Sequence, residues 1–190
     1  MKKLITVLVV VLLTCFIFSN VMANDDEKIK KHPGYVDFDK IEIPKDAEES
    51  VEVYVRGPLL KLVAAVTEKE DPALSKMLEK MLLIRVNTFS IDDKMAQDLK
   101  TKVDAIDKQL EKQNWEKVVR VKERHERVNI YIKFDKKDRM AGLVIMAIED
   151  KDEAVFVNIV GELDWTQISK LGDKFDIDEL DGLSDEKKPR

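Results

Sequence analysis

The sequence predicts an α+β fold: a mostly antiparallel sheet with helices packed on one face, a C-terminal meander of four strands and a short helix after it. Two observations support this class. Apolar residues recur with a period of two in some segments and at helical spacing in others, so strands and helices are both present in similar amounts. The four strand-like segments from Trp115 onward are joined by short polar turns, which suit antiparallel neighbours.

The first strand is predicted over VEVYVR, residues 51–56, because valine alternates with larger polar or aromatic residues. A helix is expected to begin at Gly57-Pro58, since proline at the first helical position loses only a donor that would lack a partner there. The expected inner face of this helix carries Leu59, Leu62, Val63 and Val66.

A second helix is predicted from Asp71-Pro72, with Asp71 as N-cap, and it leads into a strand that ends near Phe89. Ser90 is the expected N-cap of a third, long helix, which is predicted by one apolar stripe. The stripe consists of Met95, Leu99, Val103, Ile106 and Leu110. Opposite charges four residues apart, Asp98 with Lys102 and Asp104 with Lys108, indicate its solvent-facing side.

The meander is predicted over WEKVVRVKE, RVNIYIKF, RMAGLVIMAIE and AVFVNIVGEL. Its last strand runs into GELDWTQISKLG, where Asp164 is the expected N-cap of a short helix, Gln167 its capping-box partner and Gly172 its C-cap. Trp165 and Leu171 then remain to pack against the sheet. Because folding roles account for nearly all of these residues, we interpret the segment as structural and not catalytic.

Four parts are predicted along the chain. Lys2 and Lys3, an apolar run over residues 4–18 and then Val21-Met22-Ala23 predict a secretory signal peptide, residues 1–23. The apolar run is shorter than the about 18–20 residues that a transmembrane helix needs. Residues 24–33 are expected to form a flexible charged leader, residues 34–172 a single α+β domain, and residues 173–190 a weakly ordered charged tail.

The only cysteine, Cys15, lies in the predicted signal peptide. Thr14 stands where an acylation site usually has Gly, Ala or Ser, so a lipid anchor at Cys15 is not expected. Removal of Lys2 and Lys3 with the signal peptide changes the net charge from −5 to −7, which argues against binding of nucleic acid. We therefore expect an exported protein, periplasmic or associated with the cell envelope, without a transmembrane span after cleavage.

No catalytic residue, metal ligand or cofactor is predicted. The mature chain would contain only His32 and His125, neither with a metal-ligand partner at usable spacing. Its glycines are isolated, so no phosphate-binding loop is present. The many carboxylates are spread over turns, caps and helix faces, and no pair stands out as a glycosidase site. A hydrolase is therefore only a third hypothesis.

Four segments of the chain resemble a known family. HPGYVDF, VEVYVRGPLLKL, NWEKVVRVKE and AVFVNIVGELDWTQISKLG together look like the bacterial family called domain of unknown function 4252, over most of the chain from about Pro33 to Gly172. The resemblance implies a small exported or lipid-anchored protein. It implies no activity and no site residues.

The main functional hypothesis is protein association, either with a second copy or with an envelope protein. It depends on two strands of the meander that are apolar on both faces. If Leu143, Ile145, Val155, Val157 and Ile159 face the helices, the other face needs a cover of its own. The candidate association residues on that face are Val144, Met146, Ile148, Phe156 and Val160. The C-terminal helix, residues 35–43 or another protein chain could supply the cover.

The alternative hypothesis is a carrier or sensor of a small anionic or apolar ligand. If one sheet face is open, it gathers basic and aromatic side chains on an otherwise acidic protein. The candidate binding residues are Tyr54, Arg56, Arg120, Tyr131 and Lys133. An ordinary polar sheet face would have the same composition, because antiparallel sheets often leave one face in water.

Overall fold

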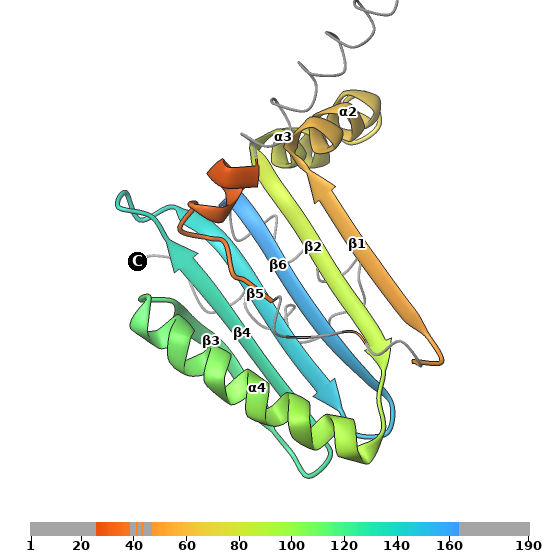
Figure 1. Ribbon diagram of the computed structural model, residues 1–190. Helices are drawn as coiled ribbons and strands as arrows, with labels where there is room; N and C mark the ends of the chain where they lie inside the picture. Colours follow the sequence, from red (N-terminus) through yellow and green to blue (C-terminus); the bar gives the residue numbers. More distant parts are fainter. Residues whose placement is uncertain (1–25, 39–40, 42, 44–46, 164–190) are drawn as a thin grey trace, which may run out of the picture. The chain divides into compact units, whose positions relative to one another are not determined.

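The computed structural model describes residues 26–38, 41, 43 and 47–163, which fall into two units, Met1–His32 and Pro33–Arg190 (Figure 1). In the first unit, residues 26–30 are helical and Lys31 pairs with Glu27 at 2.8 Å, although the sequence predicted no regular structure in this leader. The predicted signal peptide, the helix expected after Leu163 and the tail 173–190 lie outside the described residues.

The described part of the second unit follows the predicted order of strand, helix, helix, strand, long helix and four strands. The elements are β1 (Ser50–Arg56), α2 (Gly57–Thr67), α3 (Pro72–Lys80), β2 (Met81–Ser90), α4 (Asp93–Lys112), β3 (Glu116–Lys122), β4 (Glu126–Phe134), β5 (Met140–Glu149) and β6 (Glu153–Leu163). The α+β class and the meander from β3 to β6 are confirmed.

The six strands form one antiparallel sheet in the order β1-β2-β6-β5-β4-β3, so β1 and β3 are its edges (Figure 1). The strand register aligns side chains in rows across the sheet. One row consists of Tyr54, Arg85, Asn158, Val144, Tyr131 and Lys117. Because residues directly opposite each other in an antiparallel pair share a face, this row belongs to one face of the sheet.

That face is covered by α4, and we call it the α4 face. The predicted stripe on α4 is confirmed, with Leu99, Val103, Ile106 and Leu110 buried. The prediction that Ser90 caps this helix is wrong. Asp92 is the N-cap, and its Oδ1 accepts a hydrogen bond from the Met95 N–H at 2.7 Å. Ser90 instead ends β2, where its own N–H donates to the Glu49 carbonyl.

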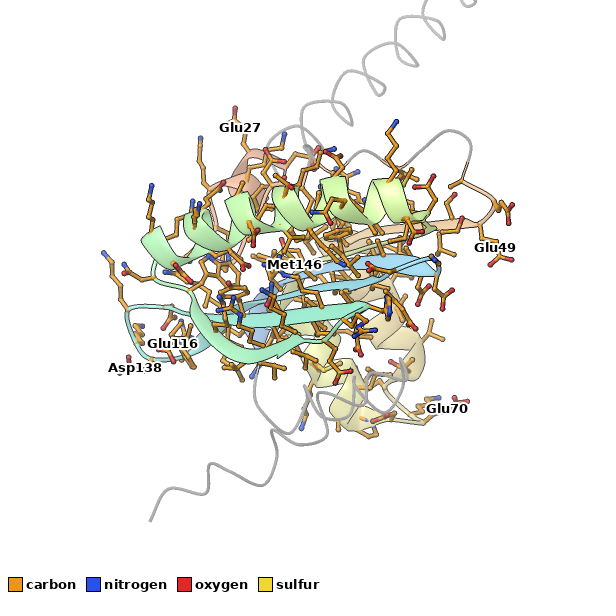
Figure 2. The ribbon with its side chains drawn as sticks, turned by 90° about the horizontal axis from the view of Figure 1, so that it is seen from below. Glu27, Glu49, Glu70, Glu116, Asp138 and Met146 are labelled. Carbon is orange, nitrogen blue, oxygen red and sulfur yellow. The ribbon has the colours of Figure 1, made fainter. Side chains whose placement is uncertain are left out.

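Helices α2 and α3 contribute side chains to an apolar cluster on the opposite face of the sheet. Asp71 caps α3 as predicted, with its Oδ1 2.9 Å from the Leu74 nitrogen. Leu60 and Ala64 of α2 pack with Met77 and Leu78 of α3 in a second apolar cluster, which includes the inward side chains of the opposite face. Those strand residues are Val128, Ile130, Ile132, Leu143, Ile145, Val157 and Ile159. In Figure 2, α4 and Glu70, which follows α2, lie on opposite sides of the sheet.

The segment before β1 is fixed on the α4 face by an asparagine and two glycines. The buried Asn158 carboxamide accepts from the Val36 N–H and donates to the Gly34 carbonyl, both at 3.0 Å. Gly34 lies directly against Gly142, where a Cβ added to Gly142 would be 2.5 Å from the Gly34 Cα. Only glycine permits this approach of two backbones.

Candidate association surface

The residues predicted to bind a small ligand do share one face, but it is the α4 face. Tyr131 is fully buried there, and the Lys133 Nζ donates to the Gln113 and Asn114 carbonyls just after α4. Tyr54 and Arg56 lie on β1, separated from β4 by β2, β6 and β5, and the exposed Arg120 lies on the far edge strand β3. The structure therefore does not bring these five residues together on one exposed surface.

The residues predicted to form an association face are also on the α4 face. Val144, Met146, Ile148 and Phe156 belong to the apolar cluster beneath α4, and Val160 is fully buried. Figure 2 shows Met146 between α4 and the sheet. Phe38 covers part of this face, with its ring centroid 5.9 Å from that of Phe156. The chain thus supplies this cover itself, from α4 and the segment around Phe38.

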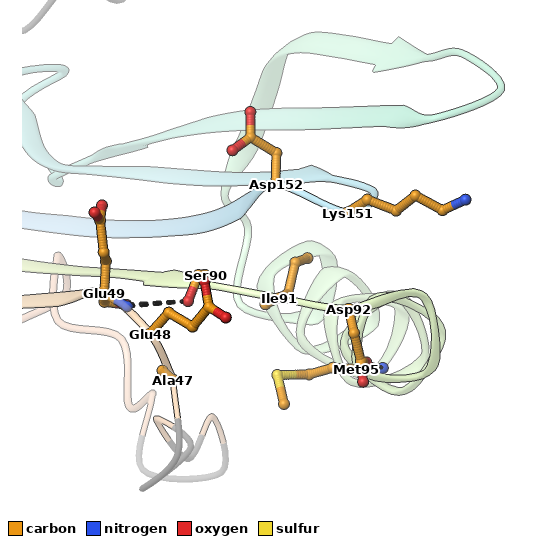
Figure 3. A pocket seen from close by; sticks show the side chains of 9 residues that line it. All are labelled: Ala47, Glu48, Glu49, Ser90, Ile91, Asp92, Met95, Lys151 and Asp152. Carbon is orange, nitrogen blue, oxygen red and sulfur yellow. Dashed lines mark hydrogen bonds between the residues drawn. The ribbon is translucent and has the colours of Figure 1, made fainter.

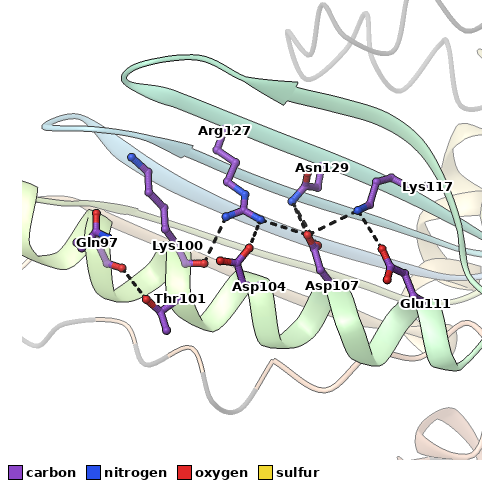
Figure 4. A network of polar contacts seen from close by, with 9 residues as sticks. All are labelled: Gln97, Lys100, Thr101, Asp104, Asp107, Glu111, Lys117, Arg127 and Asn129. Carbon is purple, nitrogen blue, oxygen red and sulfur yellow. Dashed lines mark hydrogen bonds and ion pairs between the residues drawn. The ribbon is translucent and has the colours of Figure 1, made fainter.

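A polar network lies between α4 and β4 (Figure 4). The guanidinium of Arg127 contacts the carboxylates of Asp104 at 2.5 Å and Asp107 at 3.2 Å. Asp107 also accepts hydrogen bonds from the buried Asn129 carboxamide and faces the Lys117 ammonium at 3.7 Å. The predicted helix-surface pair Asp98–Lys102 is present at 3.0 Å, whereas Asp104 is bound by Arg127.

The environment keeps Asp104 and Arg127 charged and the Tyr131 phenol neutral at neutral pH. The Arg127 hydrogen bond and charge lower the pKa of Asp104. Burial alone would lower the pKa of Arg127, but the hydrogen bond and charge of Asp104, with the charge of Asp107, raise it. Burial and the nearby Asp107 raise the pKa of the Tyr131 phenol. The arrangement suits attachment of α4 to the sheet better than proton transfer.

A hollow of about 530 Å³ lies near the N-terminus of α4 (Figure 3). It is lined by Ala47, Glu48, Glu49, Ser90, Ile91, Asp92, Met95, Lys151 and Asp152. The carboxylates outnumber the single cation, and Lys151 pairs with Asp93 at 3.2 Å, so the lining does not favour an anionic ligand. Within residues 26–38, 41, 43 and 47–163, no cluster of three or more His, Cys, Asp or Glu residues could hold a metal ion.

The two edge strands differ in the features that prevent an edge from pairing with another chain. β3 has a register shift between Lys117 and Val119 and carries the cations Lys117, Arg120 and Lys122. Bulges and charged side chains, lysine above all, are the usual devices that stop an edge from pairing with another chain. β1 pairs with β2 without a register shift and contains no lysine or proline. Val51, Glu52 and Tyr54 are exposed on it, so among the residues that the structure describes β1 is an open edge.

The helix that follows β1 exposes an apolar stripe. Leu59, Leu62, Val63 and Val66 are 49%, 61%, 41% and 74% exposed. The prediction that they form the inner face of this helix is wrong, because Leu60 and Ala64 are the buried residues of α2. The helix is apolar almost all round and Lys61 is its only charged residue, so spacing could not decide which side faces inward. The small Ala64 lies on the side that packs on α3.

We call the exposed residues of these two consecutive elements the β1–α2 surface. They are Val51, Glu52 and Tyr54 of β1, and Leu59, Leu62, Val63 and Val66 of α2. Of these, the sequence predicted only Tyr54 as a site residue. The lack of lysine and proline in β1 and the lack of a polar side on α2 were the signals that could have identified the others.

Fold and surface define a small α+β protein whose sheet is buried on both faces and whose open parts are an edge and a helix. No helix in the described part of the chain is both long and apolar enough to cross a membrane. The chain belongs to the family described as domain of unknown function 4252, which it matches over residues 44–171. Comparison with curated proteins and with solved structures finds no match.

Proposed function

We propose that this is an exported protein that acts by protein association and not by catalysis, through the β1–α2 surface. The partner is a polypeptide that adds a strand to the edge of β1. The observation that carries the proposal is the contrast between the two edges: β3 has a bulge and three cations, while β1 has no bulge and a single cation, Arg56. Strand addition to an open edge is a recurring mode of peptide recognition.

The apolar stripe on α2 supports a partner at the same place. Full burial of one aliphatic side chain contributes about 1.5–3 kcal/mol. The exposed parts of Leu59, Leu62, Val63 and Val66 together equal slightly more than two whole side chains. Covering the stripe would therefore contribute about 3–6 kcal/mol, which is enough to favour a partner but too little to hold one without the strand.

The proposed location follows from the predicted signal peptide, and the acidic net charge favours a protein partner over a polyanion. Within the envelope, such a protein would act as an assembly or adaptor component. This reading replaces the predicted association face, because α4 and Phe38 already cover Val144, Met146 and Phe156.

The proposal can be tested by site-specific photo-crosslinking in living host cells. A photoreactive residue is placed at Val51 or Val66 on the β1–α2 surface, and at the exposed Lys122 on the edge of β3 as a matched control. We expect a discrete protein adduct from Val51 and Val66 that is absent at Lys122 and that is reduced when Val53→Lys is added. Equal adducts at all three positions, or none, would contradict the proposal.

A further inference from the structure

We infer that the strand added at β1 is β1 of a second copy of this chain, paired antiparallel about Tyr54. The inference rests on the proposed function and names its partner. Pairing of two identical edges about a two-fold axis uses the same surface on both copies, which is the commonest form of homodimer. The sheets of both copies would join into one continuous antiparallel sheet.

The sequence of β1 is complementary to itself in this register. With Tyr54 opposite Tyr54 of the second copy, Glu52 lies opposite Arg56 of the second copy, and the same pair recurs on the other side of the axis. Val53 then lies opposite Val55 of the second copy. Opposite charges, aromatic pairs and β-branched pairs are the cross-strand contacts that stabilise antiparallel strands.

The charges distinguish this register from its nearest competitor. A pairing about Val53 would also align valines, but it would place Glu52 opposite Tyr54 and Arg56 opposite Ser50 of the second copy. In that register neither Glu52 nor Arg56 would face an opposite charge across the axis. A shift by one residue is excluded because it would place residues of different faces opposite each other.

The same register makes the helical stripe part of the contact. It places Val51, which is 56% exposed, opposite Gly57 of the second copy, where α2 begins. A short strand pair buries less than the about 800 Å² per partner of a typical stable interface. The stripe on α2 extends the apolar contact beyond the strand, and we expect a reversible dimer whose population depends on protein concentration.

A charge exchange tests the inference. The full coding sequence is expressed, the protein is purified in the form that the host produces, and sedimentation velocity is recorded over a concentration series. We expect Glu52→Arg alone, or Arg56→Glu alone, to weaken the dimer about tenfold, because each creates two pairs of like charges across the axis. The double variant should restore the dimer to near its original strength. Lys122→Glu, on the other edge, is the control and should change nothing.

The outcomes separate the inference from the proposed function. A double variant that stays as weak as the single variants would refute the register about Tyr54. A protein that is monomeric at every concentration, yet forms adducts with a different protein at Val51, would refute the second copy and leave the proposed function intact. Absence of both dimer and adduct, or binding to lipid vesicles that Val66→Lys abolishes, would overturn both.

Discussion

Asn158 should be among the most sensitive positions of the protein, because it fixes the segment before β1 on the sheet. Its side chain is fully buried and makes three hydrogen bonds to backbone groups: the Val36 N–H, the Gly34 carbonyl and the Leu143 carbonyl. Asn158→Leu keeps a side chain of similar size but removes all three bonds. The N–H of Val36 and the carbonyl of Gly34 would then be buried without these partners.

Loss of a hydrogen bond to a buried backbone group costs about 1–3 kcal/mol, so loss of the bonds to Val36 and Gly34 corresponds to about 2–6 kcal/mol in the free energy of unfolding. That is a large part of the about 5–15 kcal/mol of a typical domain. Equilibrium urea unfolding measures the loss, and chymotrypsin cleavage after Tyr35 or Phe38 reports whether the segment is released.

Asn87 provides the matched control, since it is also a buried asparagine of the α4 face but its Oδ1 has no hydrogen-bond partner. Asn87→Leu should change the free energy of unfolding by less than about 1 kcal/mol and leave cleavage unaltered. If Asn158→Leu were as mild as the control and the segment stayed protected, the role assigned to the carboxamide would be refuted.

Three further predictions concern the network beneath α4 and the contact between two glycines. Arg127→Met should lower the free energy of unfolding by about 2–4 kcal/mol in urea titrations, because it leaves the buried Asp107 with only Lys117 and Asn129 as partners. The control Arg124→Met, at an exposed position, should lower it by less than about 0.5 kcal/mol. Since the pKa of Asp104 is lowered in the folded state, its contribution is present above its unfolded pKa and is lost as the pH falls through the folded value. The stability difference between the native protein and Asp104→Asn should therefore be constant from about pH 5 to 7 and shrink below about pH 4; a constant difference down to pH 2 would contradict the pairing. Gly34→Ala would bring a Cβ to 2.0 Å from the Ala141 carbonyl oxygen and should destabilise by about 1–3 kcal/mol in thermal melts, whereas Gly57→Ala, whose nearest neighbour is 3.9 Å away, should be neutral or stabilising.

Most of the fold could be predicted because its signals are local. A period of two placed the strands, a period near 3.6 placed α4, and Asp71-Pro72 placed the beginning of α3. The error at Ser90 shows the limit of local signals: Ser90, Asp92 and Asp93 are all acceptable caps, and tertiary pairing of Ser90 with Glu49 at the end of β2 decided among them.

Which face of a strand or helix points inward was harder to predict than where the strands and helices lie. Alternation on β5 and β6 showed two apolar faces, but it could not show that α4 covers Val144 and Met146 and not Leu143 and Ile145. For the same reason the stripe on α2 was assigned to the inside, since both sides of that helix are apolar. Choices of this kind depend on contacts between residues far apart in the sequence.

Because both faces of the sheet are buried, few surfaces of the sheet remain through which this protein can contact other molecules. Tyr131 and Lys133, which the sequence alone offers for binding, lie with Lys117 and Arg127 where α4 is attached to β3 and β4. A sheet used in this way has only its edges and ends left for other molecules, and β3 is protected by its bulge and cations. Selection against aggregation would be expected to protect β1 as well. β1 has no bulge and only one cation, Arg56, so its exposed edge is more simply explained by a regular partner than by chance.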